Sequence, residues 1–154
     1  MKRVILSIVG ATLLFTACQN STSNLNNSEE TSIDTNMVAI SSIECYLYVN
    51  KKDTATLNFT STNDTIIGEL NYSLYEKDSN KGIIEGEIKG DTLILNYIFS
   101  SEGRESVRQV VMLKKANQLI EATGEMEEKD GKFVFKNLAN LNFEQGIIFS
   151  KIDC

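Results

Sequence analysis

The residue types that carry most protein catalysis are scarce in this chain. Its 154 residues include three cysteines and no histidine. Without histidine, the usual serine and cysteine triads and the histidine-based zinc hydrolases are excluded. Paired carboxylates could support glycoside hydrolysis, but no pair of acidic residues is set apart by its position. The composition therefore predicts a protein that is not an enzyme, and the cysteines become its most informative residues.

The first cysteine, Cys18, ends a segment typical of protein export. Two basic residues precede the uncharged apolar run 4–15, and two small residues separate this run from Cys18. The run is shorter than the about 20 residues that a membrane-spanning helix needs, and a polar tract follows it. Residues 1–17 are therefore predicted to be a cleaved signal peptide.

The stretch Leu14-Phe15-Thr16-Ala17-Cys18 resembles the bacterial lipobox, with Phe15 where leucine is usual. The resemblance implies that Cys18 receives a diacylglycerol and that signal peptidase II cleaves before it. Two or three acyl chains, at ~0.8 kcal/mol per buried methylene, would anchor the chain stably in a membrane. A plain signal peptide with a chance cysteine is the alternative.

The residue after this cysteine, Gln19, bears on location. It is not the aspartate that retains lipoproteins in the inner membrane of some Gram-negative bacteria, so the resemblance implies the outer membrane. Bacteroidetes-type lipoproteins exported to the cell surface carry an acidic cluster close behind the cysteine, whereas the first acidic residues here are Glu29 and Glu30. We therefore expect the periplasmic face, with surface exposure as the alternative.

The other two cysteines, Cys45 and Cys154, lie at opposite ends of the remaining sequence. With Cys18 committed to lipid, they are the two thiols left in an exported chain, and such thiols normally pair. The expected disulfide would close a loop of about 110 residues and stabilise the fold by up to ~4–5 kcal/mol. Two free thiols or a metal pair are the alternatives. Two cysteines without histidine make a poor zinc site, so no metal or cofactor is expected.

A Gly-Glu pair followed by an apolar residue occurs three times, with its glycine at Gly68, Gly86 and Gly124. Glycine weakens a strand, so its recurrence indicates either a sharp bend of the sheet or a ligand that lies against bare backbone. The bend is the favoured interpretation. The neighbouring glutamates are expected on the outer face, interleaved with basic side chains such as Lys89, Lys114 or Arg108.

Several aromatic and apolar residues could line a ligand cavity between these glycines. The candidate ligand-binding residues are Tyr72, Tyr97, Phe99 and Met112, floored by Gly68, Gly86 and Gly124. The same side chains could equally form a packed core. A barrel of about eight strands can be filled by its side chains or can hold one small ligand, and the filled interior is favoured.

Short runs rich in β-branched and aromatic residues must position all these groups. They recur every ten to fifteen residues with short turns between them, which is typical of an all-β fold. The predicted strands are 44–50, 54–61, 65–77, 82–89, 92–101, 105–114, 118–127, 132–136 and 146–152. Connections this short favour antiparallel hairpins, so we predict an up-and-down meander of eight or nine strands. Closure into a small calycin-like barrel removes both sheet edges, and a two-sheet sandwich is the alternative.

Period-two alternation assigns a face to each residue of these strands. In 65–77, the residues Ile66, Leu70 and Tyr72 share the apolar face, and Leu93, Leu95, Tyr97 and Phe99 do so in 92–101. In 118–127, Ile120 and Ala122 are assigned to the buried face and Glu121 to the wet face. The longer connection 137–145 could include one turn of helix that plugs a barrel end.

Three segments follow from this pattern. Residues 1–17 form the leader, residues 18–42 a lipidated cysteine with a flexible tether rich in Asn, Ser and Thr, and residues 43–154 the barrel. The net charge of −6 becomes −8 once Lys2 and Arg3 leave with the leader. An acidic chain with scattered basic residues is an improbable partner for nucleic acid.

The region 44–154, with the stretches Gly86-Glu87-Ile88-Lys89-Gly90-Asp91-Thr92-Leu93 and Ser101-Glu102-Gly103-Arg104-Glu105-Ser106-Val107-Arg108, resembles uncharacterised small lipoproteins of Bacteroidetes-type bacteria. This resemblance implies lipidation, export and a β-barrel-like fold, and no activity. The predicted architecture is also similar to that of the membrane-bound lysozyme inhibitors. The chain has neither their inhibitory loop motifs nor any tryptophan, and a shared fold does not establish function.

Two functions follow from these observations. The first is a membrane-anchored, non-enzymatic binding module for a small apolar or amphiphilic ligand. The second is a protein-interaction lipoprotein of the cell envelope, an inhibitor or assembly factor, which would use loops such as 101–104 and 137–145. An internal cavity would support the first function, and a partner that co-purifies would support the second.

Overall fold

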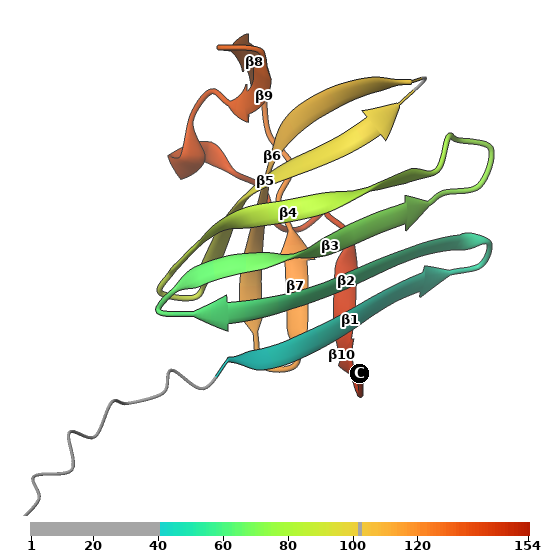
Figure 1. Cartoon of the computed structure of the whole chain (residues 1–154), viewed down its shortest axis with the longest axis vertical. Coiled ribbons are helices and arrows are strands. Elements are labelled where there is room, and N and C mark those ends of the chain that lie inside the picture. The colour runs from blue at the N-terminus through green and yellow to red at the C-terminus, as the bar shows by residue number, and fades with distance from the viewer. Residues whose placement is uncertain (1–40, 102) are drawn as a thin grey trace, which may run out of the picture. The chain divides into compact units, whose positions relative to one another are not determined.

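Ten β-strands and one short 3₁₀ helix form the part of the chain that the computed structural model describes, residues 41–101 and 103–154 (Figure 1). The leader, Cys18 with its proposed lipid, nearly all of the predicted tether and Glu102 lie outside the described residues. The elements are β1 (Ser42–Asn50), β2 (Asp53–Thr62), β3 (Thr65–Ser73), β4 (Asn80–Lys89), β5 (Thr92–Ser101), β6 (Arg104–Lys115), β7 (Gln118–Glu121), β8 (Met126–Lys129), β9 (Lys132–Phe135), η1 (Leu138–Asn140) and β10 (Ile148–Ile152).

Eight of these strands close into an antiparallel barrel, as predicted. Strands β1 to β6 each pair with the next strand along the chain, and β10 lies between β7 and β1 and completes the ring. Strand β5 pairs with β6 along its whole length, from Thr92 opposite Leu113 to Ser101 opposite Arg104. Short hairpins suffice to join consecutive strands because these strands are antiparallel neighbours. Closure leaves no free edge in the barrel wall.

Strands β8 and β9 form a hairpin outside this ring. In Figure 1 the hairpin projects beyond the end of the barrel where β6 begins. It joins the barrel through β9, which runs parallel to β6 at Val107 and Arg108. This parallel pair was not predicted, because the short connections suggested antiparallel neighbours throughout. It arises because the chain passes through β7 and β8 before β9 returns to β6.

The predicted strand 118–127 is wrong in its extent, because it divides into β7 and β8. After Ala122, whose N–H donates to the Val111 carbonyl, the chain leaves the barrel wall. Thr123 then exchanges backbone hydrogen bonds with Asn142, at 2.8 Å in each direction. The returning segment therefore satisfies the backbone groups that would otherwise have continued the ladder on β6.

Two other features also differ from what the sequence predicted. Strand β3 ends at Ser73, because a turn closed by the Lys77 N–H and the Leu74 carbonyl follows, with Glu76 at a φ of 56°. The helical turn expected in 137–145 is present as η1, and Asn137 caps it by accepting from the Ala139 N–H. Leu138 is 46% exposed, however, so this turn does not plug the barrel.

The barrel interior is filled by alternate residues of the strands. The inward faces predicted for β3 and β5 are confirmed, since Ile66, Leu70, Leu93 and Leu95 are all buried in one core cluster. The prediction for β7 is confirmed for one face and wrong for the other. Ile120 and Ala122 are buried, as predicted, with Ile120 beside Leu113 and Ile148 on the outer face. The opposite face is not wet, because Leu119 is fully buried in the core cluster and Glu121 hydrogen-bonds to Tyr72.

The Cys45–Cys154 disulfide is present, as predicted. It joins β1 to the segment that follows β10, with the two Cα atoms 5.3 Å apart. Because β1 and β10 are the first and last strands of the ring, the bridge covalently closes the seam of the barrel. It spans a sequence separation of 109 residues, so it restricts nearly the whole unfolded domain.

Candidate functional site

The barrel contains charged side chains at both of its ends. At the first, which we call the Glu44 end, β1 begins and β6 and β10 finish. At the other, which we call the Arg108 end, β1 and β3 finish and β6 begins. Both ends contain a glutamate that faces inward, but their hydrogen-bonding differs.

At the Glu44 end, the inward glutamate has close partners. The Glu44 carboxylate accepts from Lys151 Nζ at 2.8 Å, from Lys114 Nζ at 3.2 Å and from the Tyr46 hydroxyl at 2.8 Å. Burial raises the pKa of Glu44, but the hydrogen bonds from Lys151, Tyr46 and Lys114 outweigh it and bring the pKa to about 2. This cluster is satisfied internally, so it has little capacity left for a ligand.

At the Arg108 end, four side chains from four strands converge. The Tyr72 hydroxyl of β3 donates to Glu121 Oε2 of β7 at 2.9 Å. Arg108 Nη2 of β6 lies 3.9 Å from Glu121 Oε1. The guanidinium carbon also lies 5.7 Å and 5.8 Å from the ring centroids of Tyr72 and Tyr97. The cluster therefore holds a cation over two aromatic rings and beside a carboxylate.

Two groups of this cluster are not hydrogen-bonded. Among the described residues, the Tyr97 hydroxyl is the one buried side-chain N or O atom without a partner. The Arg108–Glu121 distance of 3.9 Å exceeds a hydrogen bond, and no hydrogen bond of the guanidinium occurs within residues 41–101 and 103–154. Buried polar groups are normally paired, so the Tyr97 hydroxyl is an exception. The Arg108 side chain is 38% exposed, so its donors are open to solvent or to a ligand.

The pKa values at this end reflect burial. Burial raises the pKa of Glu121, although the Arg108 charge and the hydrogen bond from Tyr72 act against it. Burial also raises the pKa of Tyr97 to about 12, with Arg108 lowering and Glu121 raising it. A buried carboxyl whose pKa is raised is an unusual neighbour for an arginine, and perturbed groups of this kind cluster at functional sites.

An opening leads to this cluster at the point where β6 changes partner. Strand β7 pairs with Met112–Lys115 of β6, and β9 pairs with Val107 and Arg108. A pocket of about 230 Å³ lies between these two pairings. We call it the β6 slot, and it is lined by Arg108, Gln109, Glu121, Ala122, Thr123, Gly124, Met126 and Phe135.

The hairpin β8–β9 forms the outer wall of the β6 slot. The Phe135 N–H donates to Gln109 Oε1 at 3.1 Å, which holds β9 against β6. The Lys136 N–H donates to the Glu125 carbonyl, and their side chains also pair at 3.1 Å, which holds the two sides of the hairpin together. The slot thus combines polar groups of the barrel with the apolar side chains of Met126 and Phe135.

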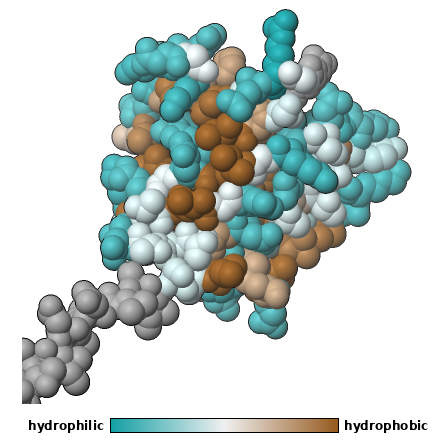
Figure 2. Space-filling model, in the orientation of Figure 1, coloured by the Kyte–Doolittle hydropathy of each residue, from teal (hydrophilic) through white to brown (hydrophobic). Residues whose placement is uncertain are grey.

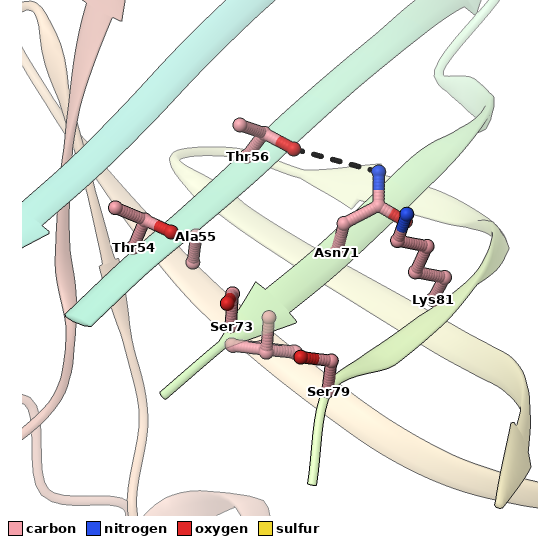
Figure 3. A pocket seen from close by; sticks show the side chains of 8 residues that line it. Thr54, Ala55, Thr56, Asn71, Ser73, Ser79 and Lys81 are labelled. Atoms are coloured by element: carbon pink, nitrogen blue, oxygen red, sulfur yellow. Dashed lines mark hydrogen bonds between the residues drawn. The ribbon is translucent and has the colours of Figure 1, made fainter. Parts of the chain in front are cut away.

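A second pocket, of about 280 Å³, lies on the outer surface of β2, β3 and β4 (Figure 3). Small polar side chains line it, and Asn71 Nδ2 donates to Thr56 Oγ1 at 3.4 Å across it. Lys81 is the charged side chain at its rim. This groove holds no unpartnered buried group, so the β6 slot is the stronger candidate.

The predicted ligand-binding residues fall into two groups. Tyr72, Tyr97 and Phe99 do lie together, with ring centroids 5.8 Å apart for Tyr72–Tyr97 and 4.7 Å for Tyr97–Phe99, and Met112 belongs to the same core. Their rings are packed among other core side chains. Gly124 lies apart from them, in the β6 slot.

The other two predicted glycines do not floor a cavity. A Cβ at Gly68 would lie 2.1 Å from the Asn58 carbonyl oxygen, and a Cβ at Gly86 would lie 2.1 Å from the Ile94 carbonyl oxygen. Both glycines therefore allow adjacent strands to approach closely where the barrel bends, which was the favoured interpretation of the repeat.

The sequence did not identify Arg108 and Glu121 as site residues, and it assigned both to the outer surface. The alternation in β6 does not show which face is buried, because both faces carry apolar residues. Arg108 shares one face with Val110 and Met112, and the other face carries Val107, Val111 and Leu113. The register places Arg108 opposite the inward Tyr97, and Lys114 opposite the inward Leu119. The partner of each residue across the sheet, which the sequence does not display, decides its face.

Comparisons with known protein families, with curated proteins and with solved structures find no match to this chain. Over residues 41–101 and 103–154, no helix has the length and hydropathy to cross a membrane. Within the same ranges, no group of three or more Cys, Asp or Glu residues is arranged to hold a metal ion.

Proposed function

We propose that this protein is a lipid-anchored, non-enzymatic binding module of the cell envelope, and that its ligand binds in the β6 slot. The anchor is Cys18, on the strength of the lipobox resemblance, and the outer membrane is the proposed location. The tether 18–42 would hold the disulfide-stapled barrel away from the lipid surface. The observation that carries the binding role is Arg108, which lines the slot and makes no hydrogen bond within the described residues.

An amphiphilic ligand suits this slot better than a purely apolar one. Its polar part would contact Arg108, whose hydrogen-bonding capacity is unused within the described residues. Its apolar part would lie against Met126 and Phe135, which are partly buried. The slot is smaller than the 300–1,000 Å³ typical of sites for drug-sized ligands, so a small molecule or the end of a longer one is indicated.

Native mass spectrometry of the full-length protein, extracted from its own membranes in mild detergent, tests this proposal. We expect a retained small molecule on the wild-type chain. Met126→Trp should fill the β6 slot and remove the retained mass, whereas Lys129→Trp, on the exposed end of the same hairpin, should not. A wild-type chain without any retained molecule, or a Met126→Trp chain that keeps it, would contradict the proposal.

A protein-interaction role is the second candidate, and a row of exposed apolar side chains favours it. On the outer face, Ile83 of β4 lies opposite Ile98 of β5, which lies opposite Val107 of β6. Ile83 is 53% exposed and Ile67 of β3 is 66% exposed. Figure 2 shows apolar side chains gathered in a band on the face that carries these strands. A partner that co-purifies with the wild type but not with Ile67→Ser/Ile83→Ser would support this role.

A further inference from the structure

We infer that the group recognised in the β6 slot is a carboxylate, carried by a small apolar acid. This inference rests on the proposed binding function and specifies the chemistry of the same site. Arg108 lines the slot and has five N–H donors, none of them hydrogen-bonded within the described residues. The site therefore has a surplus of donors and needs a group that accepts several hydrogen bonds.

The available acceptors at the Arg108 end are too few to meet this surplus. Glu121 Oε2 already accepts from the Tyr72 hydroxyl, which leaves Oε1 as the nearest acceptor, 3.9 Å from Arg108. Gln109 Oε1 is engaged by the Phe135 N–H. A hydroxyl on a ligand could satisfy only one or two of the free donors, whereas a carboxylate could accept two parallel bonds from the guanidinium fork.

Charge also favours an anion over a cation. An ammonium group in the slot would lie beside the Arg108 guanidinium, which is always protonated. Glu121 would oppose an anion only in its ionised form, and burial disfavours that form. Glu125 and Lys136, which are adjacent in sequence to lining residues of the slot, neutralise each other as an ion pair at 3.1 Å.

The apolar part of the ligand is limited by the outer wall of the slot. Phe135 lies close to Gly124, since a Cβ at Gly124 would be 3.2 Å from the Phe135 ring and 3.1 Å from Leu141. Together with Met126 these side chains confine a short chain or a single ring. The volume of about 230 Å³ accommodates a small monocarboxylic acid.

Three probes of one length separate the chemical classes: hexanoate, hexanamide and hexylamine. Each is titrated by calorimetry into the full-length chain in lipid nanodiscs, with empty nanodiscs subtracted. We expect hexanoate to bind most tightly and hexylamine least. Arg108→Gln should weaken hexanoate binding by about tenfold or more, because hydrogen bonds to charged groups are worth ~1.5–3 kcal/mol.

Matched variants keep the inference falsifiable. Arg104→Gln removes the same charge from the exposed start of β6 and should leave hexanoate affinity within about twofold. Arg108→Lys keeps the charge but not the fork, and should bind hexanoate with intermediate affinity. Hexanamide or hexylamine bound as tightly as hexanoate, or equal losses in Arg108→Gln and Arg104→Gln, would overturn the carboxylate inference.

Failure of this inference differs from failure of the proposed function. A molecule retained in native mass spectrometry and lost in Met126→Trp, together with no response to hexanoate, overturns the carboxylate inference alone. No retained molecule and no binding of any of the three probes overturns both.

Discussion

Each end of this barrel contains an inward-facing glutamate, but the pKa is lowered at one end and raised at the other. Glu44 has two lysines and a tyrosine hydroxyl within hydrogen-bond distance, and its pKa falls to about 2. Glu121 has one tyrosine hydroxyl and an arginine 3.9 Å away, and its pKa rises. Burial acts in the same direction at both ends, so the number and closeness of the partners decides the sign. The Glu44 end is built for stability, and the Arg108 end retains unused hydrogen-bonding capacity.

The largest expected effect concerns the staple at the Glu44 end. Replacing Cys45 and Cys154 together by serine should lower the free energy of unfolding by about 4 kcal/mol, because the bridge restricts a loop spanning most of the domain. Urea unfolding of wild type and variant measures this difference. Amide exchange should accelerate most in β10, near Lys151, and equal acceleration at the Arg108 end would contradict a local role for the staple.

The second effect separates the two ends by pH. The folded-state pKa of Glu44 is depressed, so its contribution is present above pH 4.5 and is lost as the pH falls from 4.5 towards 2. After allowance for the partly exposed lysines, we expect a loss of about 2 kcal/mol over this range in the wild type and little loss in Glu44→Gln. Identical pH profiles of the two proteins in urea unfolding would show that the cluster contributes nothing.

Glu121 should respond in the opposite direction. Its folded-state pKa is raised, so its contribution to stability is full below pH 4.5 and declines as the pH rises through that raised pKa. Glu121→Gln should remove this decline and leave the acid-side loss due to Glu44 unchanged. A Glu121→Gln profile that parallels the wild type above pH 4.5 would contradict the assigned environment.

The smallest effect compares two tyrosines of the Arg108 end. Tyr72→Phe removes the hydroxyl that donates to the buried Glu121 carboxyl, and should cost about 1–2 kcal/mol of unfolding free energy. Tyr97→Phe removes a buried hydroxyl without a partner, and should leave stability unchanged or raise it by up to about 1 kcal/mol. Equal losses in both variants would mean that the Tyr97 hydroxyl is bonded in the free protein.

The sequence predicted the features that depend on local pattern or on counting. Alternation in β3 and β5 placed Leu70 and Leu95 inside, and short turns implied a closed meander. The disulfide was predicted because the lipobox resemblance assigned Cys18 to lipid, which left Cys45 and Cys154 to pair. Each of these inferences needed information from one strand or from composition alone.

The features that the sequence did not predict depend on contacts between distant segments. The division of 118–127 results from the pairing of Thr123 with Asn142, which no local sequence pattern predicts. The inward position of Glu121 depends on Tyr72, 49 residues earlier in the chain, which supplies its hydrogen bond. Arg108 lies inside because its cross-strand neighbour is Tyr97. Charged residues are usually assigned to the surface, and here a barrel end accommodates them.

The most direct test of the binding site is a crystal structure of the full-length protein purified from its own membranes without exchange of bound molecules. Our account predicts density for a small ligand in the β6 slot, with acceptor atoms within hydrogen-bond distance of the Arg108 guanidinium. A slot without ligand density, in which Arg108 closes directly onto Glu121 and Tyr97 bonds to an ordered water, would contradict it.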